Sequence, residues 1–256
     1  MTSEQDTFTV RIAKRSEVQE IVSLNQRAYI NSPVQNYFAG ISTSPTAAKP
    51  ITTDPQDATR RKNQEKYLRL LYRHAFHEAR LTIVVHTSES GRERVVASSI
   101  WQLPVRERSK IRKGLMDVVS TKCLILPVIW SWGIGFIKRR SNFASTLSKR
   151  ADRVYKEKDM KESLNEQYYL GMVAVDPEFQ GKGLMSLLFR EAFDYAPSDT
   201  FMLFANGQAA RDRYTHWGFE TWAEVVMGKS ACDENGLKTS SGSGFVMYFM
   251  VKSPPQ

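Results

Sequence analysis

The segment from Tyr168 to Phe189 constrains the fold of this chain more than any other. It reads YYLGMVAVDPEFQGKGLMSLLF: a strand-like run rich in Val and Met, a turn at Asp176 and Pro177, and two glycines before a helical pattern. The first N–H groups of a helix lack intrahelical acceptors, and glycines allow a phosphate to approach the backbone. The junction therefore predicts an α/β fold with an anion site, although the glycines alone also suit an ordinary strand-to-helix turn.

The remaining sequence predicts strands and helices on both sides of this junction. Alternating and helical apolar patterns distinguish the two kinds of element. We expect a loop at Ile41–Pro55, which is rich in proline, and a helix capped by Asp57 after it. The other predicted strands are Phe8–Ile12, Leu81–His86, Arg94–Leu103, Phe201–Ala205, Phe219–Met227 and Phe245–Val251, and the other helices are Ser16–Tyr29, Leu184–Tyr195 and Asn206–His216.

Charge and cysteine content narrow the class of protein. The 256 residues include 36 Lys and Arg against 27 Asp and Glu, and residues 105–165 alone hold 15 against 6, so one segment carries the whole excess. We expect a single domain over residues 1–256 with 105–165 as a basic, partly apolar helical insertion. Cys123 and Cys232 lie far apart, which disfavours a disulfide scaffold, and the polar N-terminus does not resemble a signal peptide. We therefore expect a cytoplasmic protein without a metal.

The junction resembles one known family. It lacks the glycine patterns of a P-loop and of a dinucleotide-binding turn. It is similar to motif A of the GNAT superfamily of N-acetyltransferases, [QR]-x-x-G-x-[GA] after a V-x-V-x-P strand end, which Val173, Val175, Pro177, Gln180 and Gly183 match. Downstream, the residues at 214–219 resemble the Y-x-x-x-G-F pattern of the family. The sequence differs from motif A at its last position, where a methionine replaces Gly or Ala.

The resemblance implies a fold and a co-substrate. The fold is that of acyl-CoA N-acyltransferases: a mixed central sheet with splayed parallel strands, flanking helices and, here, a helical insertion. Acetyl-CoA would enter where Tyr168–Val175 and Phe201–Ala205 diverge, and a bulge at Gly171 would serve the splay, although tight packing would equally explain this glycine. The residues implied to bind acetyl-CoA are Met172, Val173, Ala174, Val175, Gln180, Gly181, Lys182, Gly183, Leu184, Met185, Ser186 and Asn206.

The resemblance also implies the catalytic group. Tyr214 matches the family's general acid, which would protonate the departing thiolate, and the backbone N–H of Val173 or Val175 would stabilise the oxyanion. Tyr214 could instead be a core residue packed on its aromatic neighbours. The sequence does not identify the general base: Glu166, His74 and His77 are candidates, but the last of these would also suit a solvated helix face.

The insertion contains an uncharged run, Cys123–Ile137, that allows three interpretations. At 15 residues it is shorter than the roughly 20 needed to span a bilayer. It could close over the acceptor pocket, form a dimer contact or lie on a membrane surface. We favour the pocket, with Trp130, Trp132 and Phe136 as its apolar wall, and expect Ser145–Lys161 to be a solvated basic helix face.

Together these features lead to one functional prediction and two alternatives. We expect an acetyl-CoA-dependent N-acetyltransferase that acetylates an amine of a small molecule by direct attack in a ternary complex. The alternatives are a protein or peptide N-acetyltransferase and a non-catalytic GNAT-like protein that binds nucleic acid or lipid. We expect no nucleic-acid partner, no stable membrane insertion, and a monomer or homodimer.

Overall fold

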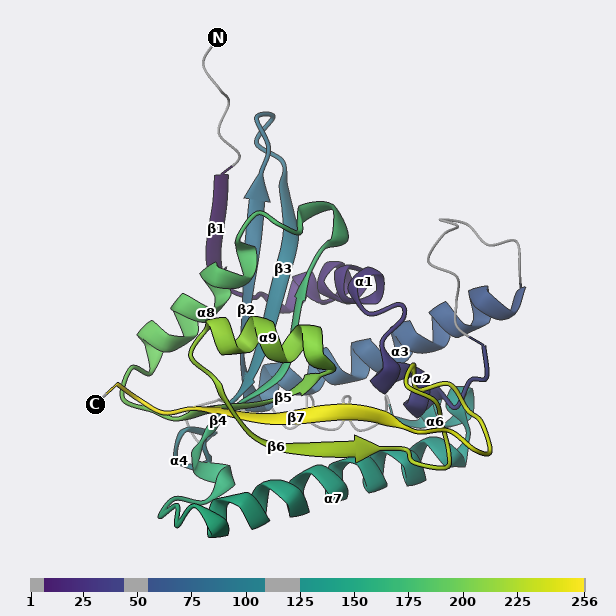
Figure 1. Ribbon diagram of the computed structural model, residues 1–256. Helices are drawn as coiled ribbons and strands as arrows, with labels where there is room; N and C mark the ends of the chain where they lie inside the picture. Colours follow the sequence, from purple (N-terminus) through teal and green to yellow (C-terminus); the bar gives the residue numbers. More distant parts are fainter. Residues whose placement is uncertain (1–6, 44–54, 109–124, 256) are drawn as a thin grey trace.

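The computed structural model describes residues 7–43, 55–108 and 125–255 of the chain (Figure 1). The strands are β1 (Thr7–Ile12), β2 (Ala79–Thr87), β3 (Glu93–Gln102), β4 (Tyr168–Val175), β5 (Phe201–Asn206), β6 (Glu220–Met227) and β7 (Phe245–Lys252). The α-helices are α1 (Val18–Ala28), α2 (Pro33–Ala39), α3 (Pro55–Glu78), α4 (Val105–Arg108), α6 (Ile125–Trp132), α7 (Ile134–Glu157), α8 (Leu184–Tyr195) and α9 (Gln208–His216). Three short 3₁₀ helices, η1 (Arg15–Glu17), η2 (Leu164–Glu166) and η3 (Pro177–Phe179), complete these elements.

The structure confirms the predicted α/β fold with a mixed sheet. Seven strands lie in the order β1-β2-β3-β4-β5-β7-β6, and β4 and β5 form the parallel pair among antiparallel neighbours. The start of α3 differs from expectation: the helix begins at Pro55, so Asp57 lies in its first turn instead of preceding it. Proline suits the first helical position because its missing N–H would have no acceptor there. Most of the loop predicted at residues 41–55 lies outside the described residues.

The parallel pair separates along its length, as predicted. Only Tyr168, Tyr169 and Leu170 of β4 pair with β5, opposite Phe201 to Leu203. Beyond that point β4 continues to pair with β3, and β5 with β7. The two strands therefore diverge because each remains held by its outer neighbour.

A β-bulge marks the start of the separation. The register between β3 and β4 shifts between Ile100 and Trp101, which leaves Gly171 outside the ladder. Apart from its chain neighbours, a Cβ atom at Gly171 would meet no atom closer than Gln102 Nε2 at 3.7 Å, an ordinary contact distance. Gly171 therefore lies at a bulge, as expected, and tight packing does not explain the glycine.

Helices cover both faces of the sheet (Figure 1). Leu203 and Ala205 of β5 share a buried cluster with residues of α8, whereas Met202 shares one with residues of α7. This alternation along a strand places α8 and α9 on one face and α1, α3 and α7 on the other. Helix α7, in the described part of residues 105–165, therefore packs against the face opposite the glycine-led helix, whereas Glu107 of α4 accepts a hydrogen bond from Tyr195 of α8.

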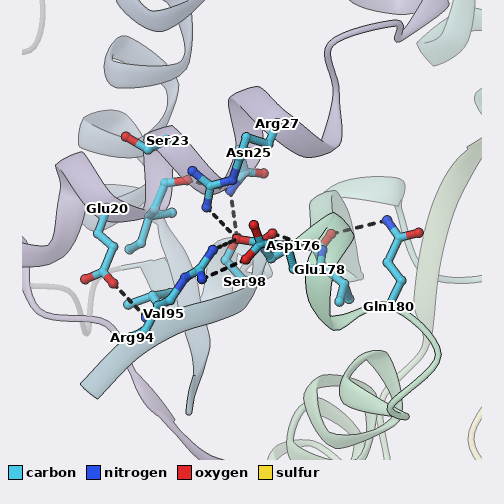
Figure 2. A network of polar contacts seen from close by, with 12 residues as sticks. Glu20, Ser23, Asn25, Arg27, Arg94, Val95, Ser98, Asp176, Glu178 and Gln180 are labelled. Atoms are coloured by element: carbon cyan, nitrogen blue, oxygen red, sulfur yellow. Dashed lines mark hydrogen bonds and ion pairs between the residues drawn. The ribbon is translucent and has the colours of Figure 1, made fainter. Parts of the chain in front are cut away.

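A buried carboxylate fixes the end of β4 (Figure 2). Asp176 has no exposed surface, and it accepts hydrogen bonds from Arg27 of α1 and from Arg94 Nη2 of β3 at 2.9 Å. Its Oδ1 also accepts from Glu178 N at 3.2 Å, which caps η3. Burial raises the pKa of Asp176, but the hydrogen bonds and charges of its partners outweigh burial and hold that pKa below its usual range.

We expect Asp176→Asn to lower the free energy of unfolding at pH 7 by about 3 kcal/mol, because two guanidinium groups lose their shared anion. The folded pKa of Asp176 is depressed, so its contribution is complete above the ordinary value of about 3.9 and is lost as pH falls below it. Urea unfolding of wild type and Asp176→Asn, from pH 7 down to below about 3.9, measures the difference in the free energy of unfolding. The difference between them should shrink in acid.

Glu178→Gln is the matched control. Glu178 pairs with the same Arg94, at 2.8 Å, but its side chain is 66% exposed. An exposed ion pair contributes roughly 0 to 1 kcal/mol, so this variant should lie close to wild type. Equal losses in the two variants would contradict a special role for the buried carboxylate.

Candidate active site

A large cavity opens where β4 and β5 diverge. Its volume is about 1330 Å³, and β4, β5, the start of α8, α9, α3 and α7 all contribute to its wall. The cavity brings together most of the residues that the sequence indicated for cofactor binding and catalysis. Those that line it are Met172, Val173, Ala174, Val175, Gln180, Gly181, Gly183, Leu184, Met185, Asn206 and Tyr214.

Two residues that were predicted to bind acetyl-CoA, Lys182 and Ser186, do not line the cavity. Lys182 is not part of the cavity wall, and its Nζ lies 5.2 Å from the ring centroid of Phe179. Ser186 also lies outside the wall, and its backbone N donates to Gly183 O at 3.0 Å.

The inner part of β4 presents backbone to this cavity. Tyr29, at the end of α1, donates a hydrogen bond from its hydroxyl to Val173 O, and Gln180 Nε2 donates to Val175 O at 3.4 Å. Burial raises the pKa of Tyr29 to about 12, so its hydroxyl stays protonated and can keep donating at neutral pH. These contacts hold β4 in place on the stretch that has no β5 partner.

The glycine turn before α8 needs both of its glycines. Gly181 has φ +81° and Gly183 has φ +73°, values that residues with a Cβ rarely adopt. No atom lies within 4 Å of a Cβ built on either residue, so the space beside the turn is open. The first turn of α8 adds N–H groups that lack intrahelical acceptors, which suits an anion.

Tyr214 both packs in the core and lines the cavity. Its ring centroid lies 5.9 Å from that of Phe189 and 6.2 Å from that of Phe219. Burial raises the pKa of Tyr214 above its usual range, and the nearby Tyr29 raises it further. The hydroxyl is therefore a proton donor and not a base at neutral pH. Packing and catalysis, the two interpretations of this residue, are compatible.

The candidates for the general base differ in position. His74 lines the cavity, and its Nε2 lies 3.4 Å from Glu78 Oε2, which also lines it. His77 is 6% exposed, so the expectation of a solvated face at this position is wrong. Glu166 lies in η2, 3.6 Å from Arg106, and outside the cavity wall. In the described ranges no group of three or more His, Cys, Asp or Glu side chains could hold a metal.

The three aromatic residues proposed as the pocket wall do not line this cavity. Trp130 is 92% exposed. Trp132 packs on Tyr67 at 5.0 Å between ring centroids and lines a separate pocket of about 120 Å³, and Phe136 is buried in a neighbouring cluster. Among the helices that the structure describes, none has the length and apolarity to cross a membrane.

Helix α7 supplies the wall instead. The residues that it contributes are Arg140, Phe143, Ala144, Leu147, Ser148 and Ala151. Leu147, Ala151 and Val154 are buried, so the expectation that Ser145–Lys161 forms only a solvated face is wrong for one side of this helix. Their spacing of four and three residues was a signal of that buried side.

Other residues of the cavity had no local sequence pattern that would identify them as part of a binding site. Tyr29, Tyr67 and Tyr169 line it, yet each belongs to an element whose apolar pattern explains it as a packing residue. Only the arrangement of α1, α3 and β4 around one space brings them together.

Comparison with known proteins agrees with this geometry. The model of the acetyltransferase (GNAT) family matches residues 144–219, a range that includes the glycine turn, Tyr214 and Phe219. The chain belongs to the GNAT family. It is accordingly an acyltransferase of the GNAT fold, and the motifs that the sequence suggested fall within the matched range. No curated protein sequence matches the chain.

Solved structures share the GNAT fold at low identity. A histone acetyltransferase HPA2 and related acetyltransferase from Corynebacterium glutamicum is 15% identical, with a TM-score of 0.53 and 98% of each chain covered. A putative arylalkylamine N-acetyltransferase 7 from Aedes aegypti is 10% identical, with a TM-score of 0.57 and coverage of 95% of this chain and 86% of the other. A polyamine N-acetyltransferase of Drosophila melanogaster is 13% identical, with a TM-score of 0.52 and coverage of 96% and 99%.

The position of α7 changes which residue should affect the acceptor. We expect Phe143→Ala to raise the acceptor KM about tenfold, because an aromatic wall residue is lost, while Trp130→Ala leaves it unchanged. Steady-state kinetics with saturating acetyl-CoA measures both, after thermal unfolding has shown that each variant folds. If the acceptor KM rose in Trp130→Ala and not in Phe143→Ala, α6 and not α7 would contact the acceptor.

Proposed function

We propose that this GNAT protein transfers the acetyl group of acetyl-CoA to an amine of a small molecule. The observation that carries the proposal is the inner edge of β4 from Gly171 to Val175, which lies along the cavity without a β5 partner. Backbone N–H and C=O groups in such a place need hydrogen-bond partners. Val173 O and Val175 O already accept hydrogen bonds from Tyr29 and Gln180, and the amides of a pantetheine arm would pair with the remaining groups, as an added strand does.

The glycine turn would hold the other end of acetyl-CoA. Gly181 and Gly183 leave open space beside the backbone, and the first N–H groups of α8 favour negative charge there. A pyrophosphate against this turn would place the pantetheine arm along β4 and the thioester near the middle of the cavity. Asn206, at the end of β5, also lines this part of the cavity.

The side chains around the middle of the cavity support acetyl transfer. Tyr214 would donate its proton to the leaving sulfur, and the N–H of Val173 or Val175 would stabilise the charge that develops on the thioester oxygen. His74 is our candidate for the base that takes the proton from the amine, because it lines the cavity beside Glu78.

A panel of amines tests the reaction and separates acceptor classes. Release of CoA is measured with aromatic amines, amino acids, polyamines, aminoglycosides and histone-tail peptides side by side. A preference for peptides would replace the small-molecule acceptor with a protein or peptide acceptor.

We also propose a cytoplasmic location, since Cys232 is a free buried thiol, as expected in a reducing compartment.

We expect Gly183→Glu to weaken acetyl-CoA binding at least about tenfold, because it adds bulk and negative charge where a phosphate would lie. Calorimetric titration of acetyl-CoA into wild type and variant measures this loss.

Gly91→Glu is the matched control for this substitution. Gly91, in the turn between β2 and β3, has φ +75° and likewise no atom within 4 Å of a built Cβ. The control therefore shares the backbone strain and the added charge but lies outside the cavity wall. If both variants kept the wild-type affinity, the pyrophosphate would not bind at this turn.

We expect Tyr214→Phe to reduce kcat about 100-fold to 10,000-fold while acetyl-CoA affinity stays the same, because only a proton donor is removed. Single-turnover kinetics, which isolate the chemical step, provide the measurement. Tyr195→Phe removes a hydroxyl that donates to Glu107 outside the cavity and should be silent. A loss below threefold in Tyr214→Phe would assign the acid role to another group.

A further inference from the structure

The part of the cavity between α3 and α7 is lined by both apolar and polar side chains. We call it the acceptor side, because the glycine turn lies at the other end of β4. Its apolar residues are Phe38, Leu71, Phe143, Leu147 and Phe204, and its polar groups include Tyr67, Tyr169 and Arg140. A ligand that fits here needs an apolar or aromatic body and a group that matches these polar side chains.

Arg140 is the cation of α7 on this side. Its Cζ lies 5.9 Å from the ring centroid of Phe38, which packs in turn on Tyr67 at 6.1 Å and on Phe143 at 5.0 Å. Within the described residues no carboxylate pairs with Arg140. Its neighbour Arg139, in contrast, donates hydrogen bonds to Phe38 O at 2.7 and 3.1 Å. Arg139 therefore has a structural role, whereas the guanidinium of Arg140 remains available for a ligand.

Two tyrosine hydroxyls lie near the same guanidinium. Burial raises the pKa of Tyr67, and it raises that of Tyr169 to about 12, while the charge of Arg140 lowers both pKa values in part. Both hydroxyls are therefore protonated at neutral pH. Tyr67 comes from α3, Tyr169 from β4 and Arg140 from α7, so donors from three elements face one space. Such a set suits a carboxylate, which accepts several hydrogen bonds at once.

The acidic residues of the cavity do not favour a polycation. Among the described lining residues, the carboxylates are Glu78 and Asp212. Glu78 lies 3.4 Å from His74, and Asp212 on α9 pairs with Arg211 at 2.9 Å. Arg108, Arg140 and Arg213 line the same cavity. A polyamine would therefore meet more cationic than anionic groups.

We propose that Arg140, together with the hydroxyls of Tyr67 and Tyr169, binds a carboxylate carried by the acceptor, so that the acceptors are amino acids with apolar or aromatic side chains. This inference rests on the proposed acetyl transfer to an amine. It assigns Arg140 to substrate specificity, since the residue would bind the acceptor without taking part in proton transfer.

Matched acceptors that differ only in the carboxylate test this assignment. Wild type should acetylate phenylalanine with a kcat/KM at least about tenfold above that of phenethylamine, the gain expected from a charged hydrogen bond. Arg140→Gln should remove this preference by lowering the value for phenylalanine, with little change for phenethylamine and none in acetyl-CoA affinity. Tyr67→Phe and Tyr169→Phe should each reduce the preference by a smaller factor.

Lys149→Gln is the control, since it removes the same charge from an exposed position of α7 outside the cavity wall. It should retain the wild-type preference. If wild type treated the two acceptors alike, or if Arg140→Gln kept the preference, the carboxylate site would be refuted while acetyl transfer stood. A loss of acetyl-CoA affinity in Arg140→Gln would assign the arginine to the cofactor instead.

A binding measurement keeps the two proposals separable. If no amine were acetylated, the proposed function would fail. Calorimetry with N-acetylphenylalanine and N-acetylphenethylamine would still report on the site, because it needs no turnover. Tighter binding of the carboxylate compound to wild type, lost in Arg140→Gln, supports the site, and equal binding of the two compounds overturns it.

Discussion

The site depends on the point where β4 and β5 stop pairing. Both strands are fixed by their outer neighbours, and their mutual pairing ends at Leu170 and Leu203. From there the sheet cannot satisfy the inner edge of β4, and buried backbone groups without partners are costly. The same feature that weakens the middle of the sheet therefore creates a strand edge that a ligand with amide groups can complete.

This edge can bind a ligand only if β4 does not move toward β5 and pair with it. The bulge at Gly171 resets the alternation of side chains, so Met172 and Ala174 pack on the α3 side of the sheet. Asp176 then ties the end of β4 to α1 and β3, and Tyr29 holds Val173 O. Asp176 N bonds to Val96 O of β3, so by the alternation of an antiparallel ladder the backbone groups of Val173 face the edge toward β5. The contacts keep the strand in place, and at Val173 O the Tyr29 hydroxyl occupies a position on that edge.

Much of the cofactor half could be predicted from the sequence because its signals are local. The predicted strand Tyr168–Val175 and the helix that starts at Leu184 have the same bounds in the structure, and the turn between them needs glycines for its φ values. The acceptor side of the cavity could not be predicted in the same way. Trp130 and Phe136 belong to one apolar run, yet one is 92% exposed and the other 2%. Hydrophobicity indicates that such a run packs somewhere, but the partner decides which side chain is buried.

The positions of the charged side chains could likewise not be predicted from the sequence alone. Residues 105–165 carry a large basic excess, but of the described Lys and Arg residues in that range only Arg108 and Arg140 line the cavity. Charges on the outer face are screened by water and salt and say little about a ligand. Arg140 is exposed as well, but its Cζ lies 5.9 Å from the ring centroid of the buried Phe38 and it lines the cavity, so it can meet a ligand that the cations outside the cavity wall do not reach. The ligand is therefore selected by the position of one cation relative to Tyr67 and Tyr169, and the net charge of the insertion does not decide it.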